Sequence, residues 1–309
     1  PRGGRQRHGN NASPSRTRRV VNTNRIPLKV LFAIIGTVLA WSSAFVVIRA
    51  VLPVFAPGEL AFLRQLVAVP LLAIWMIGQK WLWPTVREWV LIAIFGLTWF
   101  SIYIVALNTA EQTIDAGTAS FVVNIGPLLI AVGAFMFLGE KLSRNLIPGA
   151  LIALAGVGLI ARGTSSSDRV DLVGVLWALV ATVTYAVGVL TQKPALKRLS
   201  SNQVTLLGAT IALIPLFWWA PEALTTVQSA PIDAIVGAVW LGAIPTALGF
   251  GLWGYALKRM PAGRLGVSTY VVPPLVIVES AILLGEWPHP IAIVGGLIAL
   301  AGVWWSRRS

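Results

Sequence analysis

The sequence contains no cysteine, which excludes disulfide bonds, cysteine-based zinc fingers, thiolate catalysis and iron–sulfur clusters. Charged residues are also scarce: they make up 11% of the 309 residues, against roughly 25% in an ordinary soluble domain. Hydrophobic residues make up 56%. A soluble fold of this length could not bury that much apolar surface, so the composition indicates a membrane protein.

Recognisable enzyme motifs are absent as well. The sequence has no Gly-Lys-Ser/Thr phosphate-binding loop, no His-Glu-x-x-His zinc motif and no Gly-x-Ser-x-Gly nucleophile motif. Its two histidines, His8 and His289, lie in a polar tail and at the end of an apolar run, where neither indicates a metal site. We therefore expect no enzymatic activity, no metal and no other cofactor.

Positive charge is concentrated at the start of the chain. Of the 24 Lys and Arg residues, eight lie between Arg2 and Lys29, in a stretch without acidic residues or apolar periodicity. We interpret residues 1–28 as a disordered basic tail in the cytosol. An Arg-rich, acid-poor start also fits an organellar transit peptide. Because basic residues that flank apolar runs are a topology signal, the net charge of +13 does not indicate a nucleic-acid partner.

Runs of about 17 to 25 apolar residues are long enough to cross ~30 Å of hydrocarbon as a helix. The segment from Pro221 to Asp233 is the longest interruption between such runs, and we expect it to be an external connection. The sequence contains ten runs, near residues 29–50, 57–79, 86–107, 114–138, 146–162, 171–193, 202–220, 234–257, 263–285 and 289–306.

Placing the tail in the cytosol tests this span count against every later connection. Twenty of the 24 basic residues then lie on the cytosolic side, three lie outside (Arg49, Arg162 and Arg169), and Arg64 lies within a span. This asymmetry follows the positive-inside rule. The prediction is an integral membrane protein with both termini cytoplasmic.

An internal repeat predicts the architecture. Residues 149–157 read GALIALAGV and residues 295–303 read GGLIALAGV, an offset of 146 residues. Each repeat contains five predicted spans, an odd number, so the second repeat enters the membrane from the opposite side. We therefore predict an all-α polytopic fold of ten transmembrane helices, in two inverted five-helix repeats at 29–162 and 171–306. The same offset aligns Leu138-Gly139-Glu140 with Leu284-Gly285-Glu286, and Pro127 with Pro273.

These features resemble a known family. The two Gly-Glu span ends followed by Gly-rich helices, Trp41-Ser42-Ser43-Ala44-Phe45 in the first span and Leu63-Arg64 in the second are similar to the EamA group of the drug/metabolite transporter superfamily. The resemblance covers nearly all of residues 29–306. It implies a ten-helix inverted-repeat transporter of a bacterial inner (plasma) membrane that exports amino acids, in the manner of the YddG-like exporters, or other metabolites.

Several polar aromatic residues lie near the bilayer centre of their predicted spans. No headgroup is available there to hydrogen-bond an indole N–H or a phenol O–H, so these edges should face protein or a water-filled cavity. A pseudo-twofold axis should bring repeat counterparts to one central space, although ordinary helix packing is the alternative. The predicted substrate-binding residues are Trp41, Tyr185, Asn124, Tyr270 and Trp99.

Two further pairs are predicted to move during transport. Tyr103 and Trp253 correspond at an offset of 150 and lie nearer opposite mouths of the path, which favours gating. Pro127 and Pro273 interrupt their helices and are candidate hinges. Small residues also recur in two rows, for which we predict close helix packing rather than a functional site: Gly149, Ala153 and Gly156, and Gly295, Ala299 and Gly302.

Arg64 and Glu279 are the charged residues well within the predicted spans. Both lie roughly 9 Å from the outer boundary at 1.5 Å of rise per residue, and ionisable groups at such depth are costly and usually functional. We predict an ion pair between them in at least one transport state. The alternatives are that Glu279 carries protons, or that each charge is solvated separately in a cavity.

The sequence therefore predicts a secondary transporter with alternating access, a central aromatic-lined site and small metabolites such as amino acids as substrates. Its partners would be the substrate and the lipid bilayer. A multidrug or organic-cation exporter is the nearest alternative, because aromatic walls also attract cations. A channel or a non-transporting membrane protein is the alternative from another class.

Overall fold

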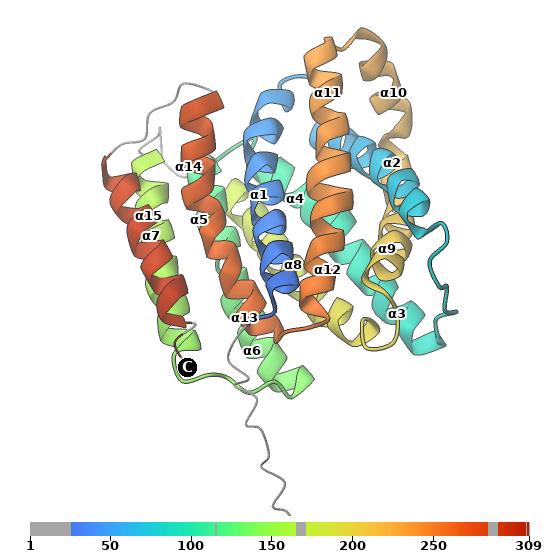
Figure 1. Ribbon diagram of the computed structural model, residues 1–309. Coiled ribbons are helices and arrows are strands. Elements are labelled where there is room, and N and C mark those ends of the chain that lie inside the picture. The colour runs from blue at the N-terminus through green and yellow to red at the C-terminus, as the bar shows by residue number, and fades with distance from the viewer. Residues whose placement is uncertain (1–25, 115, 165–170, 284–289, 307, 309) are drawn as a thin grey trace, which may run out of the picture.

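The computed structural model describes residues 26–114, 116–164, 171–283, 290–306 and 308, and every regular element among them is a helix. The helices run side by side in one bundle (Figure 1). Eight spans are long and strongly apolar, and two shorter apolar helices, Leu146–Arg162 and Pro290–Ser306, complete the predicted set. Most of the predicted tail, residues 1–25, lies outside the described part of the chain.

Each repeat supplies five spans. The first repeat contains α1 (Leu28–Val51), α2 (Pro57–Met76), α3–η1–α4 (Val86–Phe95, Gly96–Ile102 and Tyr103–Ala110), α5–α6 (Ala116–Val123 and Gly126–Leu138) and α7 (Leu146–Thr164). The second contains α8 (Leu172–Ala195), α9–η2–α10 (Ser201–Leu216, Phe217–Trp219 and Ala220–Ser229), α11–η3–α12 (Ile232–Leu241, Gly242–Leu248 and Gly249–Leu257), α13–η4–α14 (Ala262–Gly266, Val267–Val271 and Val272–Leu283) and α15 (Pro290–Ser306). The prediction of ten spans in two inverted repeats is confirmed.

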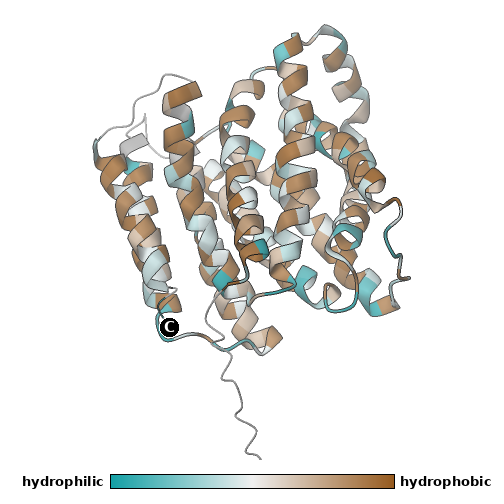
Figure 2. Cartoon of the chain, viewed as in Figure 1, coloured by the Kyte–Doolittle hydropathy of each residue, from teal (hydrophilic) through white to brown (hydrophobic). Residues whose placement is uncertain are grey.

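Polar and apolar side chains are distributed as in a protein surrounded by hydrocarbon. Phe137 and Leu297 are 74% and 65% exposed, whereas Gln65 and Gln192 are fully buried. Brown, the colour of hydrophobic residues, accordingly predominates along the helices in Figure 2. A bilayer supplies no hydrogen-bond partners, so apolar side chains face the lipid and polar ones face the protein interior.

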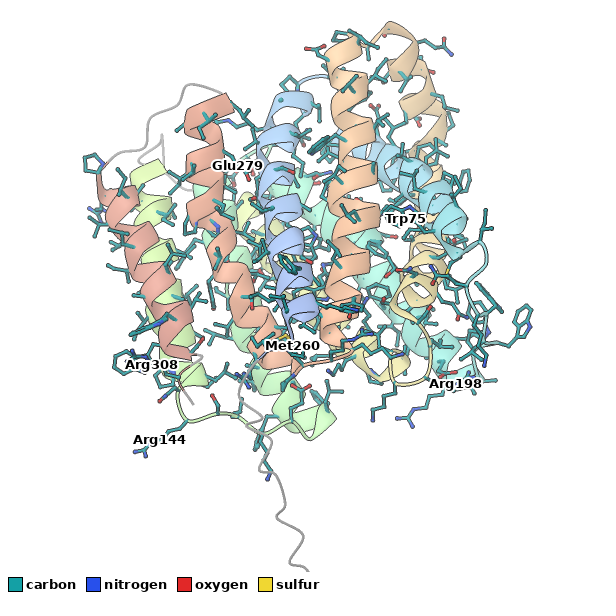
Figure 3. The ribbon with its side chains drawn as sticks, in the orientation of Figure 1. Trp75, Arg144, Arg198, Met260, Glu279 and Arg308 are labelled. Atoms are coloured by element: carbon teal, nitrogen blue, oxygen red, sulfur yellow. The ribbon has the colours of Figure 1, made fainter. Side chains whose placement is uncertain are left out.

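One end of the bundle carries Arg144, Arg198 and Arg308, and we call it the basic end (Figure 3). At this end α1 begins and α15 ends, at the bottom of Figure 1. Glu279 lies toward the other end (Figure 3), which we call the far end.

Two spans contain a π-helical segment at equivalent positions, η1 and η3, 146 residues apart. Such segments widen the helix locally and are frequent at functional sites. In η3, Pro245 has no backbone N–H to donate, so the regular hydrogen-bond ladder is interrupted there. The predicted correspondence of Tyr103 with Trp253, at an offset of 150, stays a prediction.

The fourth and ninth spans break at the predicted prolines. The α5 helix ends at Val123, and α6 begins at Gly126 with Pro127 in its first turn. The 3₁₀ segment η4 ends at Val271, and Pro273 lies in the first turn of α14. The predicted interruptions are confirmed, and hinge motion at these sites remains a prediction.

The expected loop at 221–233 is wrong in part. The seventh span continues through η2 into α10, and only Ala230 and Pro231 separate α10 from α11. Pro221 occupies the first turn of α10, where its missing N–H is tolerated, and Glu222 favours the positive end of the helix dipole. A proline and a charged residue at the start of a helix lower the local hydropathy. For this reason the start of α10 resembled a loop in the sequence.

The helices α7 and α15 pack through the predicted small-residue rows. A Cβ on Gly156 would lie 2.4 Å from the Ala299 nitrogen, and a Cβ on Gly302 would lie 2.4 Å from the Ala153 nitrogen. The 146-residue repeat relates the two contacts to each other. The backbones of α7 and α15 therefore touch directly along a seam between the repeats, and the packing prediction is confirmed.

Candidate substrate site

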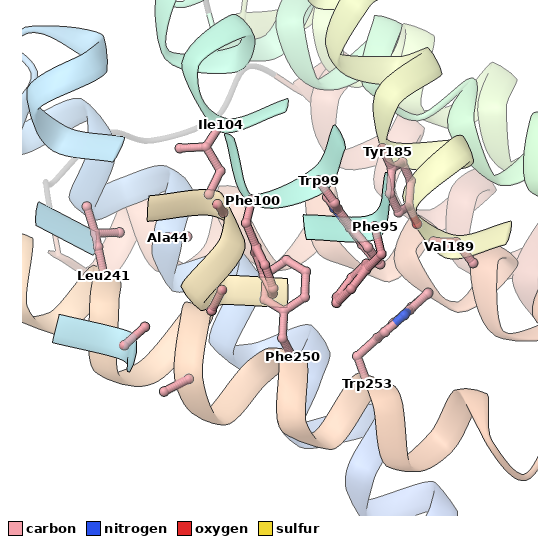
Figure 4. Close-up of a cluster of buried hydrophobic side chains, with 14 of the residues drawn as sticks. Ala44, Phe95, Trp99, Phe100, Ile104, Tyr185, Val189, Leu241, Phe250 and Trp253 are labelled. Atoms are coloured by element: carbon pink, nitrogen blue, oxygen red, sulfur yellow. The ribbon is translucent and has the colours of Figure 1, made fainter. Parts of the chain in front are cut away.

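Trp99 lies at the centre of an aromatic cluster that both repeats supply (Figure 4). Its side chain projects from η1, with ring centroids 5.0 Å from Tyr185 and 4.8 Å from Phe250. Trp41 lies 5.9 Å from Trp99 and 5.0 Å from Trp253. These separations are those of interacting ring pairs. The predicted residues Trp41 and Tyr185 thus meet at one ring, that of Trp99.

A cavity of about 80 Å³ lies against this cluster. Its walls come from both repeats and are mostly aromatic and aliphatic. Both features are typical of small-molecule sites, which combine apolar walls with a few polar groups. The predicted residues that line it are Trp41, Arg64, Trp99, Tyr103, Asn124 and Tyr185.

Glycines make room for the cavity aromatics. A Cβ on Gly188 would lie 2.7 Å from the Trp99 Cβ, and a Cβ on Gly126 would lie 2.6 Å from the Tyr185 Cδ1. Any larger side chain at these positions would displace the rings. Each ring can therefore occupy its position only because the facing residue on a neighbouring helix is a glycine.

The π segment η3 supplies polar partners to the cavity wall. The Trp41 indole Nε1 donates to the Pro245 carbonyl at 3.2 Å. Arg64 donates from Nε and Nη2 to the Thr246 Oγ1, at 3.3 and 3.2 Å, and the Thr246 hydroxyl donates to the Leu241 carbonyl at 2.7 Å. Two adjacent residues of η3 thus hold Trp41 and Arg64.

The predicted Arg64–Glu279 ion pair is not formed in this structure. The Glu279 Oε1 lies 2.6 Å from the Ser42 hydroxyl, while Arg64 is bound to Thr246. The carboxylate that acts electrostatically on Arg64 belongs to Glu111, which follows α4. Each charge therefore has a different neighbour from the one predicted, because equal depth does not place two helices face to face.

Tyr270, Tyr103 and Trp253 differ in how they lie relative to the cavity. Tyr270 is fully buried in a cluster with Ala131, Ala150 and Val303, and it does not line the cavity. Tyr103 lies in the cavity wall, with its ring centroid 6.0 Å from that of Tyr185. Trp253 is 1% exposed and belongs to the aromatic cluster. A gating role for Tyr103 and Trp253 stays a prediction.

Sequence reasoning missed three contributors to the site. Phe250 closes the cluster beside Trp99, Thr246 holds Arg64, and Thr269 lines the cavity next to the break before α14. Pro245, in the middle of an apolar run, was the one available signal for η3. Phe250 and Thr269 carry no signal, because their residue types are common in any membrane helix.

On the basic-end side of the cluster, polar contacts join the two repeats. Gly139 has a φ of 65°, the left-handed conformation that ends α6 and turns the chain. Glu140 then accepts from the Ala262 nitrogen at 2.9 Å, at the start of α13. Lys193 of α8 donates to the Met260 carbonyl at 2.5 Å and lies 3.9 Å from Glu140. Glu140 of the first repeat is thus linked to α8 and α13 of the second repeat at this end.

The arrangement suits binding rather than catalysis. Over the described residues, no group of three His, Asp or Glu side chains is placed to hold a metal ion. The cavity instead presents ring faces, an amide at Asn124 and a guanidinium at Arg64. Such a site can hold an apolar side chain and a polar head of one small molecule.

Comparisons with known proteins agree with this geometry. The EamA-like transporter family matches residues 28–162 and 172–308. A probable terminal-alkyne amino-acid exporter of Streptantibioticus cattleyicolor is 34% identical over 89% of this chain and 92% of its own length. A probable amino-acid metabolite efflux pump of Salmonella typhimurium is 28% identical over 88% and 93%. One solved crystal structure, 21% identical, covers 90% of this chain and 97% of its own with a TM-score of 0.72, which shows a shared fold. With both repeats matched and a relative at this identity along nearly its whole length, the chain belongs to the EamA-like transporter family.

Proposed function

We propose that this transporter exports neutral amino acids, including aromatic ones, or similar small metabolites across a bacterial inner membrane by alternating access. The observation that carries the proposal is the cavity that Trp41, Trp99 and Tyr185 line between the repeats. Ring faces at this spacing can stack on an apolar or aromatic side chain. Two relatives whose names include amino-acid export or efflux support the same class of cargo.

Unsatisfied polar atoms on the basic-end side support a second conformation. The Trp253 Nε1 and the Gln192 side-chain amide are buried there without a hydrogen-bond partner in the described part of the chain. A buried polar group left unpaired costs about 1–3 kcal/mol. A conformation that opens the basic end would give these groups water or substrate as partners. Alternating access would then be an exchange between this conformation and that one.

The direction of transport depends on the orientation of the bundle, for which we propose a cytosolic basic end. Because the chain has no native Cys, single Cys residues can be introduced at Arg144, on the basic end, and at Gln228 of α10, on the far end. A membrane-impermeant maleimide applied to intact cells should label Gln228→Cys alone. Labelling of Arg144→Cys alone would reverse the orientation.

Counterflow in proteoliposomes tests the transport proposal. Purified protein should exchange radiolabelled phenylalanine or another neutral amino acid saturably, with and without an imposed pH gradient. Absence of saturable exchange across a panel of amino acids would contradict the proposal, and linear, non-saturable flux would favour a channel. A response to the pH gradient would add proton coupling, for which Glu279 is the candidate.

Export of organic cations is the second candidate function, and the aromatic walls favour it through cation–π attraction. Arg64 opposes it, because its positive charge lines the same cavity. The same proteoliposomes can be assayed with a lipophilic quaternary ammonium compound. Saturable exchange of that cation with no exchange of amino acids would replace the amino-acid proposal.

A further inference from the structure

Arg64 brings a positive charge into an otherwise uncharged cavity. Every other described residue in the cavity wall has an uncharged side chain. Arg64 lies seven residues into α2, ~10 Å along the helix at 1.5 Å per residue, and it is 5% exposed. A guanidinium at that depth is energetically costly unless its charge is compensated and its N–H donors have hydrogen-bond acceptors.

The described part of the protein supplies a hydrogen-bond acceptor for only some of the N–H donors of this guanidinium. Arginine has five N–H donors in a planar fork. In this structure Nε and one N–H of Nη2 both point at a single acceptor, the Thr246 Oγ1. Both donors of Nη1 and the second donor of Nη2 have no acceptor in the described part of the chain. The unfilled donors lie at the end of the fork, which is the edge that takes a carboxylate in bidentate geometry.

None of the described carboxylates occupies that edge. Glu279 is hydrogen-bonded to Ser42, and Glu111 acts on Arg64 electrostatically without an ion-pair contact in the described structure. The group that completes the fork therefore has to come from elsewhere. A solute in the cavity is in position to supply it, because Arg64 and the cluster rings Trp99 and Tyr185 line the same space.

We infer that Arg64 binds the carboxylate of the substrate through its Nη1–Nη2 edge, while the aromatic cluster receives the substrate side chain. The inference rests on the proposed function and narrows it to solutes with a free carboxylate and an apolar or aromatic side chain. Thr246 is a positioning residue, since its hydroxyl holds the other edge of the guanidinium and turns the fork toward the cavity. Esters, amines and organic cations lack the group that Arg64 requires.

A ligand series on the wild-type protein tests this directly. Binding of radiolabelled phenylalanine to purified protein is measured with four competitors: phenylalanine, its methyl ester, phenethylamine and 3-phenylpropionate. A charge-assisted hydrogen-bonded pair corresponds to about a 10- to 100-fold change in affinity. We expect the ester and the amine to compete at least tenfold more weakly than phenylalanine, and 3-phenylpropionate to retain measurable competition. Equal competition by the ester overturns the inference without any variant.

Substitutions test whether the preference for the acid over the ester depends on Arg64. Arg64→Gln should remove the preference for the acid over the ester, and Arg64→Lys should retain part of it, because an ammonium keeps the charge and loses the fork. Arg144→Gln removes the same charge from the exposed basic end and should leave the preference unchanged. If Arg64→Gln does not fold, Arg64→Lys and the wild-type series decide. A folded Arg64→Gln or Arg64→Lys protein with the full wild-type preference would contradict the role of the fork.

Binding and counterflow separate this inference from the proposed function. If wild-type protein binds phenylalanine tenfold more tightly than its ester but exchanges no amino acid, the carboxylate site stands and amino-acid export fails. If it exchanges phenylalanine and its ester equally well, export of small metabolites stands and the role of Arg64 fails.

Discussion

The two repeats meet in two different ways. At the α7–α15 seam, Gly156 and Gly302 bring backbone against backbone. At the centre, Trp41 and Tyr185 meet the Trp99 ring and leave a cavity beside it. Side-chain size accounts for the difference, because small residues allow helices to touch, whereas rings hold them apart and pack imperfectly.

A methyl group added at a glycine would meet different neighbours in these two regions. In the seam, a methyl group would strike the backbone of the neighbouring helix, which cannot rotate away. At Gly126 and Gly188, a methyl group would strike the rings of Tyr185 and Trp99. The seam is therefore expected to limit stability, and the cluster to limit ligand binding. The following substitutions test this comparison, from the largest expected effect on stability to the smallest.

The largest effect is expected in the seam, where two adjacent buried glycines form a matched pair. A Cβ on Gly295 would lie 2.5 Å from the Gly156 carbonyl oxygen, whereas a Cβ on Gly296 would lie 3.7 Å from Pro274. Gly295→Ala should lower the free energy of unfolding by about 1–3 kcal/mol through overpacking. Gly296→Ala should be neutral or stabilising, because alanine favours helix. Thermal unfolding in detergent measures both, and equal melting temperatures would contradict a rigid seam.

A smaller effect on stability, and a larger one on binding, is expected in the cluster. Trp41→Ala and Tyr185→Ala should each weaken phenylalanine binding several-fold, since a ring pair contributes about 0.5–1.5 kcal/mol beyond area burial. Phe135→Ala provides a control, because that ring is exposed on the outer surface. Affinity unchanged from wild type in both folded cluster variants would make these rings packing residues.

An effect on conformation rather than on stability is expected at the basic end, where Glu140 joins the repeats. Glu140→Gln removes the charge that Ala262 and Lys193 contact, and should favour opening of this end by about 1–2 kcal/mol. The readout is the maleimide reactivity of a single Cys introduced at Ala256, a buried residue of α12, which should rise several-fold in the Glu140→Gln background. Unchanged reactivity would mean that the cluster alone closes this end.

The smallest effect is expected at the exposed ion pair between Arg198 and Glu88. Exposed pairs contribute little, because water screens the charges and two side chains lose freedom. Arg198→Gln should therefore leave the melting temperature and the affinity for phenylalanine unchanged. A drop comparable to that of Gly295→Ala would show that the connections at the basic end, rather than the seam, limit stability.

Residue positions along the chain were more predictable than their directions around each helix. Trp41, Asn124 and Tyr185 were expected in a central cavity from depth and repeat symmetry, and all three line it. Tyr270 has a comparable depth and lies in a separate packing cluster. The spans are apolar on nearly every side, so hydrophobic periodicity does not reveal which face of a helix points inward.

The sequence by itself determined the number of spans, the inversion of the repeats and the small-residue rows, because these follow from run length, parity and residue size. Only the tertiary structure decided that Arg64 is held by Thr246 and that Glu279 is hydrogen-bonded to Ser42. Contacts between helices depend on their rotation and on local π segments such as η3. Both arise from the packing of the whole bundle, which no single span encodes.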